Sequence, residues 1–226
     1  MGLEPRASVM PTFDLITEAD ARVLPIGSTV ELAANGHITP LARDTLKARR
    51  VTVVRAGSVD PDLAAGLAPV GDVRRVAVGC DHTGVALKRA LVTHLRGRGL
   101  NVDDQGVDAA QPPVDYPDVA AAVARAVARR EADAGIVIDG AGIGSAIAAN
   151  KIRGVRAAMG VDETTARYAR EHNGVNVLTL GSTLLPTHDE ARRIVDTFIS
   201  TPMREARYVR RLAKIQRLEE EETRGR

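Results

Sequence analysis

The chain has 226 residues, 44% of them hydrophobic and 27% charged, which suits a globular protein with one good core and a small additional module. Lys and Arg number 31 against 29 Asp and Glu, and aromatic residues make up only 2%, so no nucleic-acid-binding surface is expected. The single cysteine excludes an internal disulfide framework and fits a reducing cytosol. No apolar run approaches the roughly 18 to 20 residues that span a membrane. We therefore expect a cytoplasmic protein with neither nucleic-acid nor membrane partners.

Residues 1–55 predict a small α/β module. The stretch TEADARVL reads as a helix with Thr17 as N-cap and Asp20 closing a capping box, and TPLARDTLKARR as a helix with Thr39 as N-cap and Pro40 at its first position. TVEL and VTVVR are short strand candidates. A module of this size buries little core alone, so we expect it to pack against something else. Residues 56–72, rich in Gly, Ala and Pro, are predicted to be a linker.

From residue 73 to the end, strand and helix patterns alternate with short connections. Strands are predicted at 74–80, 100–106, 134–140, 155–161 and 175–181, and helices at 84–99, 116–130, 142–150, 162–172, 187–200 and 201–222. Five such alternations predict an α/β domain with a five-stranded parallel sheet covered by helices on both faces. In such sheets ligands bind at the carboxyl ends of the strands.

Polar residues follow several of these strands. Asp139 ends an apolar run and is followed by Gly140, Gly142 and Gly144, whose bare amides, before a helix, favour an anion or a developing oxyanion. Two alternatives remain open. One is a dinucleotide fingerprint, although the spacing is G-x-G-x-G, with Asp162 as the ribose-binding acid. The other is a turn that uses glycine for geometry alone.

Histidines and arginines suggest further roles. His82 stands at a helix start and His172 at a helix end, and together with Asp139 they would make an acid–base set for proton transfer on a sugar. The alternative for His172 is stabilisation of the helix C-terminus. Arg207 and Arg211 share a face of the last helix and could clamp a phosphate, although the pattern alone favours a solvated helix. No residue spacing suggests zinc, and no cofactor is expected.

Five segments resemble the ribose-5-phosphate isomerase B / galactose-6-phosphate isomerase family: VAVGCDHTGVALKRALVTHL, DYPDVAAAVARAV, GIVIDGAGIGSAIAANKIRGVRAA, AREHNGVNVLTLGS and RIVDTFIST. The resemblance covers about residues 73–215. It implies a Rossmann-like three-layer α/β/α domain that forms a dimer, with a tetramer as an alternative, and that interconverts phosphorylated aldoses and ketoses through an enediolate without a metal. The active site is expected to be shared between two subunits.

The same resemblance implies roles for individual residues. Asp81 and His82 match the family's substrate-contacting pair, His172 matches the histidine that assists ring opening, and Asp139 occupies the position of the catalytic base. The substrate- and phosphate-binding set that it implies is Tyr116, Gly140, Gly142, Gly144, Asn173, Arg207 and Arg211.

Four positions depart from the family pattern. Asp139 replaces the usual cysteine base, Ala141 a threonine, Thr183 a phosphate-binding arginine and Tyr208 a histidine. Ser145 stands where one branch of the family carries a glutamate base. The favoured reading is an isomerase that converts ribose 5-phosphate to ribulose 5-phosphate. The alternatives are a non-catalytic or hetero-oligomeric sugar-phosphate-binding subunit, an isomerase for a four- or six-carbon sugar phosphate, and a dinucleotide-binding domain.

The N-terminal module has a weaker resemblance of its own. DLITEADAR and HITPLARDTLKARRVTVV look like the short N-terminal region of ethanolamine cobalamin adenosyltransferases and related proteins of bacterial microcompartments. The resemblance implies contact with a microcompartment shell or cargo, and a location inside such a compartment as an alternative to the free cytoplasm.

Overall fold

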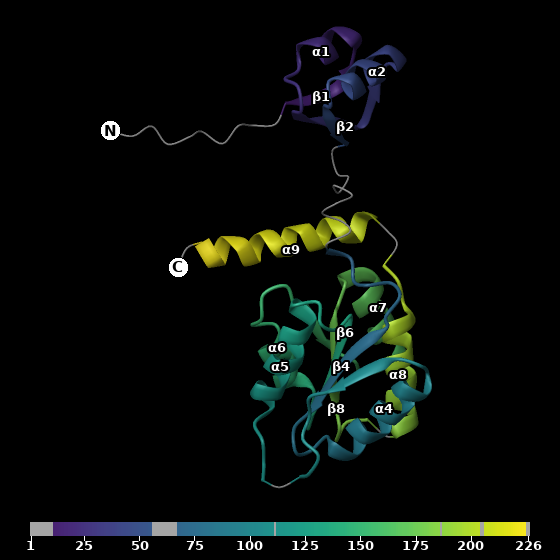
Figure 1. The fold of residues 1–226 in the computed structure, drawn as a ribbon, viewed down its shortest axis with the longest axis vertical. Coiled ribbons are helices and arrows are strands. Elements are labelled where there is room, and N and C mark those ends of the chain that lie inside the picture. The colour runs from purple at the N-terminus through teal and green to yellow at the C-terminus, as the bar shows by residue number, and fades with distance from the viewer. Residues whose placement is uncertain (1–10, 56–66, 111, 186, 204–205, 225–226) are drawn as a thin grey trace, which may run out of the picture. The chain divides into compact units, whose positions relative to one another are not determined.

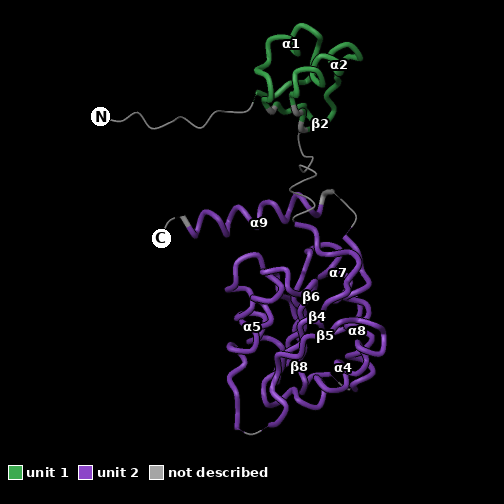
Figure 2. The backbone as a smooth tube through the Cα atoms, viewed as in Figure 1, with its two compact units in different colours: residues 1–64 green, residues 65–226 purple. Residues whose placement is uncertain are grey.

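The computed structural model describes residues 11–55, 67–110, 112–185, 187–203 and 206–224. The chain divides into two compact units, Met1–Ala64 and Ala65–Arg226 (Figure 2), and the division falls inside the segment predicted to be a linker. Within the described residues, no helix is both long enough and apolar enough to cross a membrane.

Unit 1 is a small three-stranded parallel sheet with two helices. Its elements in chain order are β1 (Thr12–Ile16), α1 (Glu18–Val23), β2 (Thr29–Ile38), α2 (Pro40–Ala48) and β3 (Thr52–Arg55), with the strand order β1-β2-β3. Both predicted helix starts are confirmed. Thr17 and Asp20 form a reciprocal capping box, and Thr39 caps α2 with Pro40 in its first turn.

The sequence missed strand β1. Asp14 interrupts its apolar residues, and its pairing with β2 shifts register between Phe13 and Leu15, so no clean alternation marks it. Unit 1 nevertheless has a core of its own, made of residues from both helices and all three strands or their ends: Ile16, Ala21, Leu24, Val30, Leu32, Ala42, Leu46 and Val51.

Unit 2 confirms the predicted α/β fold (Figure 1). Its elements are β4 (Arg75–Cys80), α4 (Val85–Gly97), β5 (Asn101–Asp104), α5 (Tyr116–Ala128), β6 (Ala134–Asp139), α6 (Ile143–Ala149), β7 (Ala157–Met159), α7 (Glu163–Asn173), β8 (Val177–Gly181), α8 (His188–Ser200) and α9 (Ala206–Arg224). All five strands are parallel, in the order β5-β4-β6-β8-β7.

Alternating side chains of the strands divide the core into two layers. Val76, Val78 and Cys80 face one apolar cluster with α4, α7 and α8, whereas Ala77 faces another with α5 and α6. Helix α5 lies close to the sheet because β4 and β6 carry glycines beneath it. A Cβ at Gly79 would come within 2.6 Å of the Val119 side chain. This close contact holds α5 against the face of the sheet and places Tyr116, its first residue, near the carboxyl ends of the strands.

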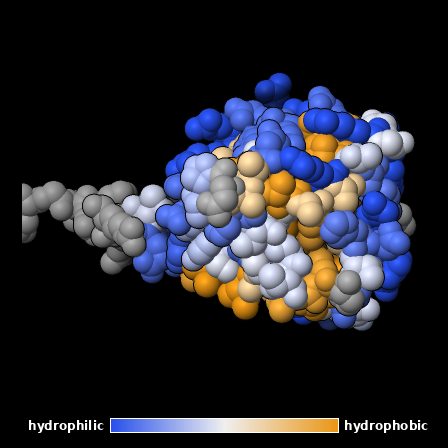
Figure 3. Space-filling view, turned by 90° about the horizontal axis from the view of Figure 1, so that it is seen from below, coloured by the Kyte–Doolittle hydropathy of each residue, from blue (hydrophilic) through white to orange (hydrophobic). Residues whose placement is uncertain are grey.

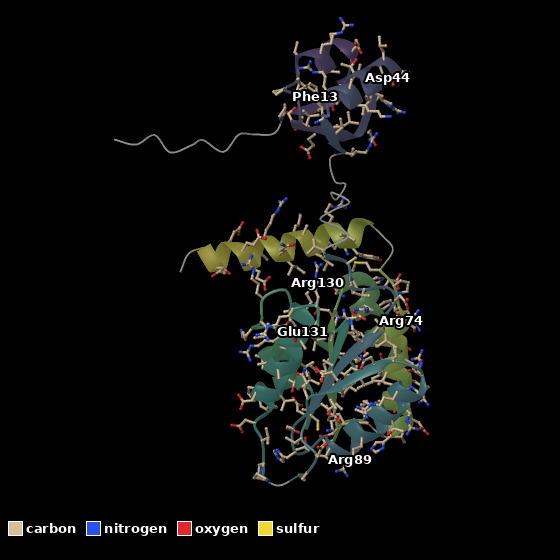
Figure 4. The ribbon with its side chains drawn as sticks, viewed as in Figure 1. Phe13, Asp44, Arg74, Arg89, Arg130 and Glu131 are labelled. Carbon is tan, nitrogen blue, oxygen red and sulfur yellow. The ribbon has the colours of Figure 1, made fainter. Side chains whose placement is uncertain are left out.

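The two ends of the parallel strands form chemically different borders of the sheet. We call the border at the strands' carboxyl ends the carboxyl edge and the border at their amino ends the amino edge. Each helix from α4 to α8 starts near the carboxyl ends of the strands and runs back towards their amino ends, because the strands are all parallel. Figure 4 marks the two ends: Arg89, from the second turn of α4, lies at the carboxyl edge, and Arg130, which precedes β6, lies at the amino edge.

Candidate active site

The strand order reverses between β4 and β6, and this is where a parallel sheet offers a ligand crevice. β4 leads to β5 on one side, whereas β6 pairs with β4 on the other. Asp139 is the last residue of β6, and Asp81 follows β4, with its amide donating to the Ile138 carbonyl at 3.1 Å. Both carboxylates are buried, being 5% exposed at Asp81 and 4% at Asp139. Two buried acids at the switch point mark it as the candidate site.

Four hydrogen bonds hold the Asp139 carboxylate. Oδ1 accepts from the amide of Ala141 at 2.8 Å and from the amide of Gly142, and Oδ2 accepts from the amide of Ser145 at 2.9 Å and from its hydroxyl. Gly142 adopts a left-handed conformation with φ 78°, which wraps the loop amides around the carboxylate. The loop after β6 is therefore an anion-binding nest that Asp139 itself occupies.

This arrangement divides the glycines that the sequence grouped together. The Gly142 amide is bonded to Asp139 and is not directed at a ligand. The amides of Gly140 and Gly144 have no hydrogen-bond acceptor within the described part of the chain. Among the three glycines, the amides left for a substrate oxygen are therefore those of Gly140 and Gly144.

Hydrogen bonds join the loops that follow β4, β6 and β8. Asp81 Oδ1 accepts from both the amide and the hydroxyl of Thr83, at 2.8 and 2.6 Å, and Ser182 Oγ lies 3.4 Å from Thr83 Oγ1. Thr183 Oγ1 donates to the Gly140 carbonyl at 2.5 Å. The Thr183 side chain thus fixes the glycine loop in place.

Tyr116 and His82 complete the carboxyl edge. The Tyr116 ring lies directly over Gly144, where a Cβ would come within 2.6 Å of two ring carbons. His82 Nδ1 lies 3.2 Å from the Val114 carbonyl, so the imidazole is oriented by the segment that leads into α5. These two residues, Asp81, Asp139 and the three glycines are therefore all brought to one edge.

The remaining predicted residues lie at the opposite edge. His172 lies in the last turn of α7, where its ring stacks between those of Tyr168 and Tyr208, at centroid distances of 4.6 and 4.4 Å. The Arg211 guanidinium lies 5.6 Å from the Tyr208 ring centroid, and Asn173 Nδ2 donates to the Tyr168 carbonyl at 3.0 Å. The side chain of Arg207 lies outside the described residues. One copy of the chain thus holds two separate parts of the predicted site.

Comparisons with known proteins give the chain its family. The profile described as Ribose/Galactose Isomerase matches residues 76–215. The chain belongs to the ribose/galactose isomerase family. It is 39% identical to ribose-5-phosphate isomerase B of Escherichia coli over 148 residues, which are 66% of this chain and 98% of the relative.

Solved structures of similar proteins agree. The Clostridium thermocellum ribose-5-phosphate isomerase B is 41% identical, covering 65% of this chain and 98% of that one, with a TM-score of 0.63. The Mycoplasma genitalium enzyme, whose structure has ribulose 5-phosphate bound, is 41% identical over 65% of this chain and 97% of that one, with a TM-score of 0.62. The matched profile leaves residues 1–75 of this family member outside the ribose/galactose isomerase region.

The only cysteine of this ribose/galactose isomerase is not a substitute base. Cys80 is fully buried at the end of β4, and its thiol lies 3.6 Å from the Val107 carbonyl. Burial raises the pKa of this thiol to about 11, against a smaller lowering effect of the nearby Lys88 charge.

Two buried polar side chains near the site, Lys88 and Ser145, were not predicted from the sequence. Lys88 on α4 is fully buried, and its Nζ pairs with Asp104 at 2.9 Å and Asp108 at 3.0 Å. Burial by itself lowers the pKa of Lys88, but the bonds and charges of the two aspartates outweigh it and hold that pKa above its usual value. Its placement beside Leu87 and Leu91 on the apolar face of α4 was the available signal. Ser145 was named only as the position of a missing glutamate.

Proposed function

We propose that this protein is an aldose–ketose isomerase that interconverts ribose 5-phosphate and ribulose 5-phosphate by ring opening and enediolate proton transfer. The observation that carries the proposal is the likeness to the Mycoplasma genitalium enzyme, which has ribulose 5-phosphate bound and aligns over 97% of its length at 41% identity. The two buried carboxylates at the switch point support it, because proton transfer between neighbouring carbons needs a base held against the sugar.

The carboxyl edge supplies the chemistry in this proposal. Asp139 takes the proton from C2 of the open-chain aldose and returns it to C1, while the hydroxyl proton passes from O2 to O1. The free amides of Gly140 and Gly144 hold the enediolate oxygen as charge develops on it. Asp81, His82 and Tyr116 contact the sugar from the loops that follow β4 and β5.

In this proposal a second copy of the chain supplies the residues for ring opening and phosphate binding. His172, Asn173 and Arg211 lie at the amino edge of their own sheet, so they serve a substrate only at the carboxyl edge of another subunit. We infer a homodimer with two shared sites, in which His172 assists ring opening and Arg207 and Arg211 bind the phosphate. A tetramer of two such dimers is the alternative.

The carboxyl edge also has surface suited to a partner. Four of its large apolar side chains are 40% to 58% exposed: Tyr116, Ile143, Val161 and Leu184. Figure 3 shows apolar surface on this end of unit 2. Exposed apolar surface that borders a half-formed site favours contact with a second copy.

The competing function is a sugar-phosphate-binding subunit without catalysis. The hydrogen bonds on Asp139 favour it, since Oδ1 must give up one of its two amide bonds before it can take a proton while Ser145 holds Oδ2. An assay separates the two. The purified full-length protein should form ribulose 5-phosphate from ribose 5-phosphate, and Asp139→Asn should lower kcat by about 10²- to 10⁴-fold.

The matched control is Asp103→Asn, an exposed carboxamide substitution in β5 that should leave kcat unchanged. Equal inactivity of wild type and Asp139→Asn, with ribose 5-phosphate still bound, would establish the binding subunit. Tight binding of NAD without isomerisation would instead favour the alternative of a dinucleotide-binding domain. A parallel assay with four- and six-carbon sugar phosphates decides the substrate, which the Thr183 position leaves open because an arginine is absent there.

For unit 1 we propose association with a bacterial microcompartment, with the cytoplasm as the location of the enzyme outside such a compartment. Two observations support this. Its two helical segments resemble the N-terminal region of ethanolamine cobalamin adenosyltransferases, and unit 1 has a core of its own. A chain that lacks residues 1–64, which are unit 1, should keep isomerase activity and lose co-sedimentation with microcompartments. Unchanged co-sedimentation would refute the association.

A further inference from the structure

One side chain of the loop after β6 has no part in the reaction described above. Ser145 lies in the first turn of α6 and is fully buried. Its amide and its hydroxyl both donate to Oδ2 of Asp139, whereas Oδ1 accepts only backbone amides, those of Ala141 and Gly142. Ser145 therefore provides the side-chain donor among the four groups that hold the carboxylate.

The helix itself gains nothing from a serine at this position. A serine inside a helix usually turns its hydroxyl back to a carbonyl of the preceding turn, and alanine is the better helix former. The following residues of α6 include Ala146, Ala148 and Ala149. The hydroxyl of Ser145 instead points across the loop to Asp139. The position thus gives up helix propensity and holds a carboxylate.

The hydroxyl controls the orientation of the carboxylate more than its location. The backbone of Asp139 is held by the sheet, since it pairs with Gly181 of β8 and its carbonyl accepts from the Ser182 amide at 2.8 Å. The orientation of the Asp139 carboxylate plane is fixed because both of its oxygens accept hydrogen bonds, Oδ1 from the loop amides and Oδ2 from Ser145. A proton-transferring group must be kept within about 0.5 Å and 10–20° of its productive position.

We propose that Ser145 is the positioning residue of this active site, which holds the Asp139 carboxylate at the angle from which it takes the sugar proton. The role rests on the proposed function, in which Asp139 is the base.

The test compares steady-state kinetics of full-length wild type, Ser145→Ala and Ser145→Thr with ribose 5-phosphate. Ser145→Ala should lower kcat by about 10- to 100-fold, as small misplacements of catalytic groups do, and leave KM within about twofold, since the buried hydroxyl does not face the substrate. Ser145→Thr keeps the donor and should recover part of kcat. If Ser145→Ala does not fold, Ser145→Cys keeps the side-chain volume with a weaker donor.

Thr179→Val is the matched control. Thr179 is as buried as Ser145, and its hydroxyl donates to the Gly142 carbonyl of the same loop at 2.7 Å without touching Asp139. It should lower the melting temperature and leave kcat near that of the wild type. A wild-type kcat in Ser145→Ala, or equal losses of kcat in Ser145→Ala and Thr179→Val, would overturn the role of Ser145 and leave the proposed function standing. An inactive wild-type protein would overturn the proposed function and, with it, this role.

Discussion

The contact between Gly144 and the Tyr116 ring allows function to be separated from stability. A Cβ at Gly144 would lie 2.6 Å from Cε2 and Cζ of Tyr116, whereas ordinary carbon contacts are about 3.5 Å or longer. Gly144→Ala should therefore push the ring out by about 1 Å. The ring is free to move because Tyr116 is 40% exposed.

The expected effects on stability and on activity have different sizes. Alanine favours the helix over glycine by at most about 1 kcal/mol, and this offsets the lost ring contact, so the melting temperature should change by no more than about 4 °C. A displacement of about 1 Å in a group that contacts the substrate costs up to about 100-fold in rate. We therefore expect kcat/KM for ribose 5-phosphate to fall by about 10- to 100-fold in a protein that melts almost normally.

A double-mutant cycle identifies the cause. If Gly144→Ala acts through the tyrosine, it should cost little further activity in a Tyr116→Ala background, because the clash is then absent. Full kcat/KM in Gly144→Ala would refute the placement of Tyr116 in the site. The same loss in both backgrounds would show that the alanine acts on the loop and not on the ring.

Three further predictions concern the buried groups around β4. Asp104→Asn should destabilise unit 2 by about 1–2 kcal/mol in urea unfolding, because buried Lys88 loses one of its two carboxylates, whereas exposed Asp103→Asn should change little. The folded-state pKa of Lys88 is raised. The stabilisation of the folded state by the charged Lys88 is therefore full below about pH 10.4, the ordinary lysine pKa, and is lost as the pH rises through the raised pKa. The difference in unfolding free energy between wild type and Asp104→Asn should therefore narrow above about pH 10.5, and a constant difference up to pH 11.5 would contradict this. Cys80, with its pKa raised to about 11 by burial, should fail to react with a thiol reagent at pH 8 until the protein unfolds, and rapid reaction of the native protein would show that it is accessible.

The amino-acid sequence by itself determined the local structure and the fold class. Strand and helix periods are local patterns, and the helix caps at Thr17, Thr39, Asp162 and Thr187 depend on residues within three positions of one another. Regular alternation then permits few arrangements other than a parallel sheet with helices on both faces. Strand β1 was not predicted because its register with β2 is irregular and because it depends on a partner strand about 20 residues away.

Only the tertiary structure decided which of the predicted site residues lie together and which groups they contact. Sequence patterns placed Asp139 beside three glycines, but the folded loop showed that its carboxylate takes the amide of Gly142 and both donors of Ser145. They placed His172 in the same set as Asp139, yet the direction of α7 puts that histidine at the opposite edge of the sheet. Hydrogen-bond partners and sheet edges depend on contacts between segments far apart in the chain. For that reason the sequence indicated which residue types are present, and the packing of strands and loops determined which of them meet.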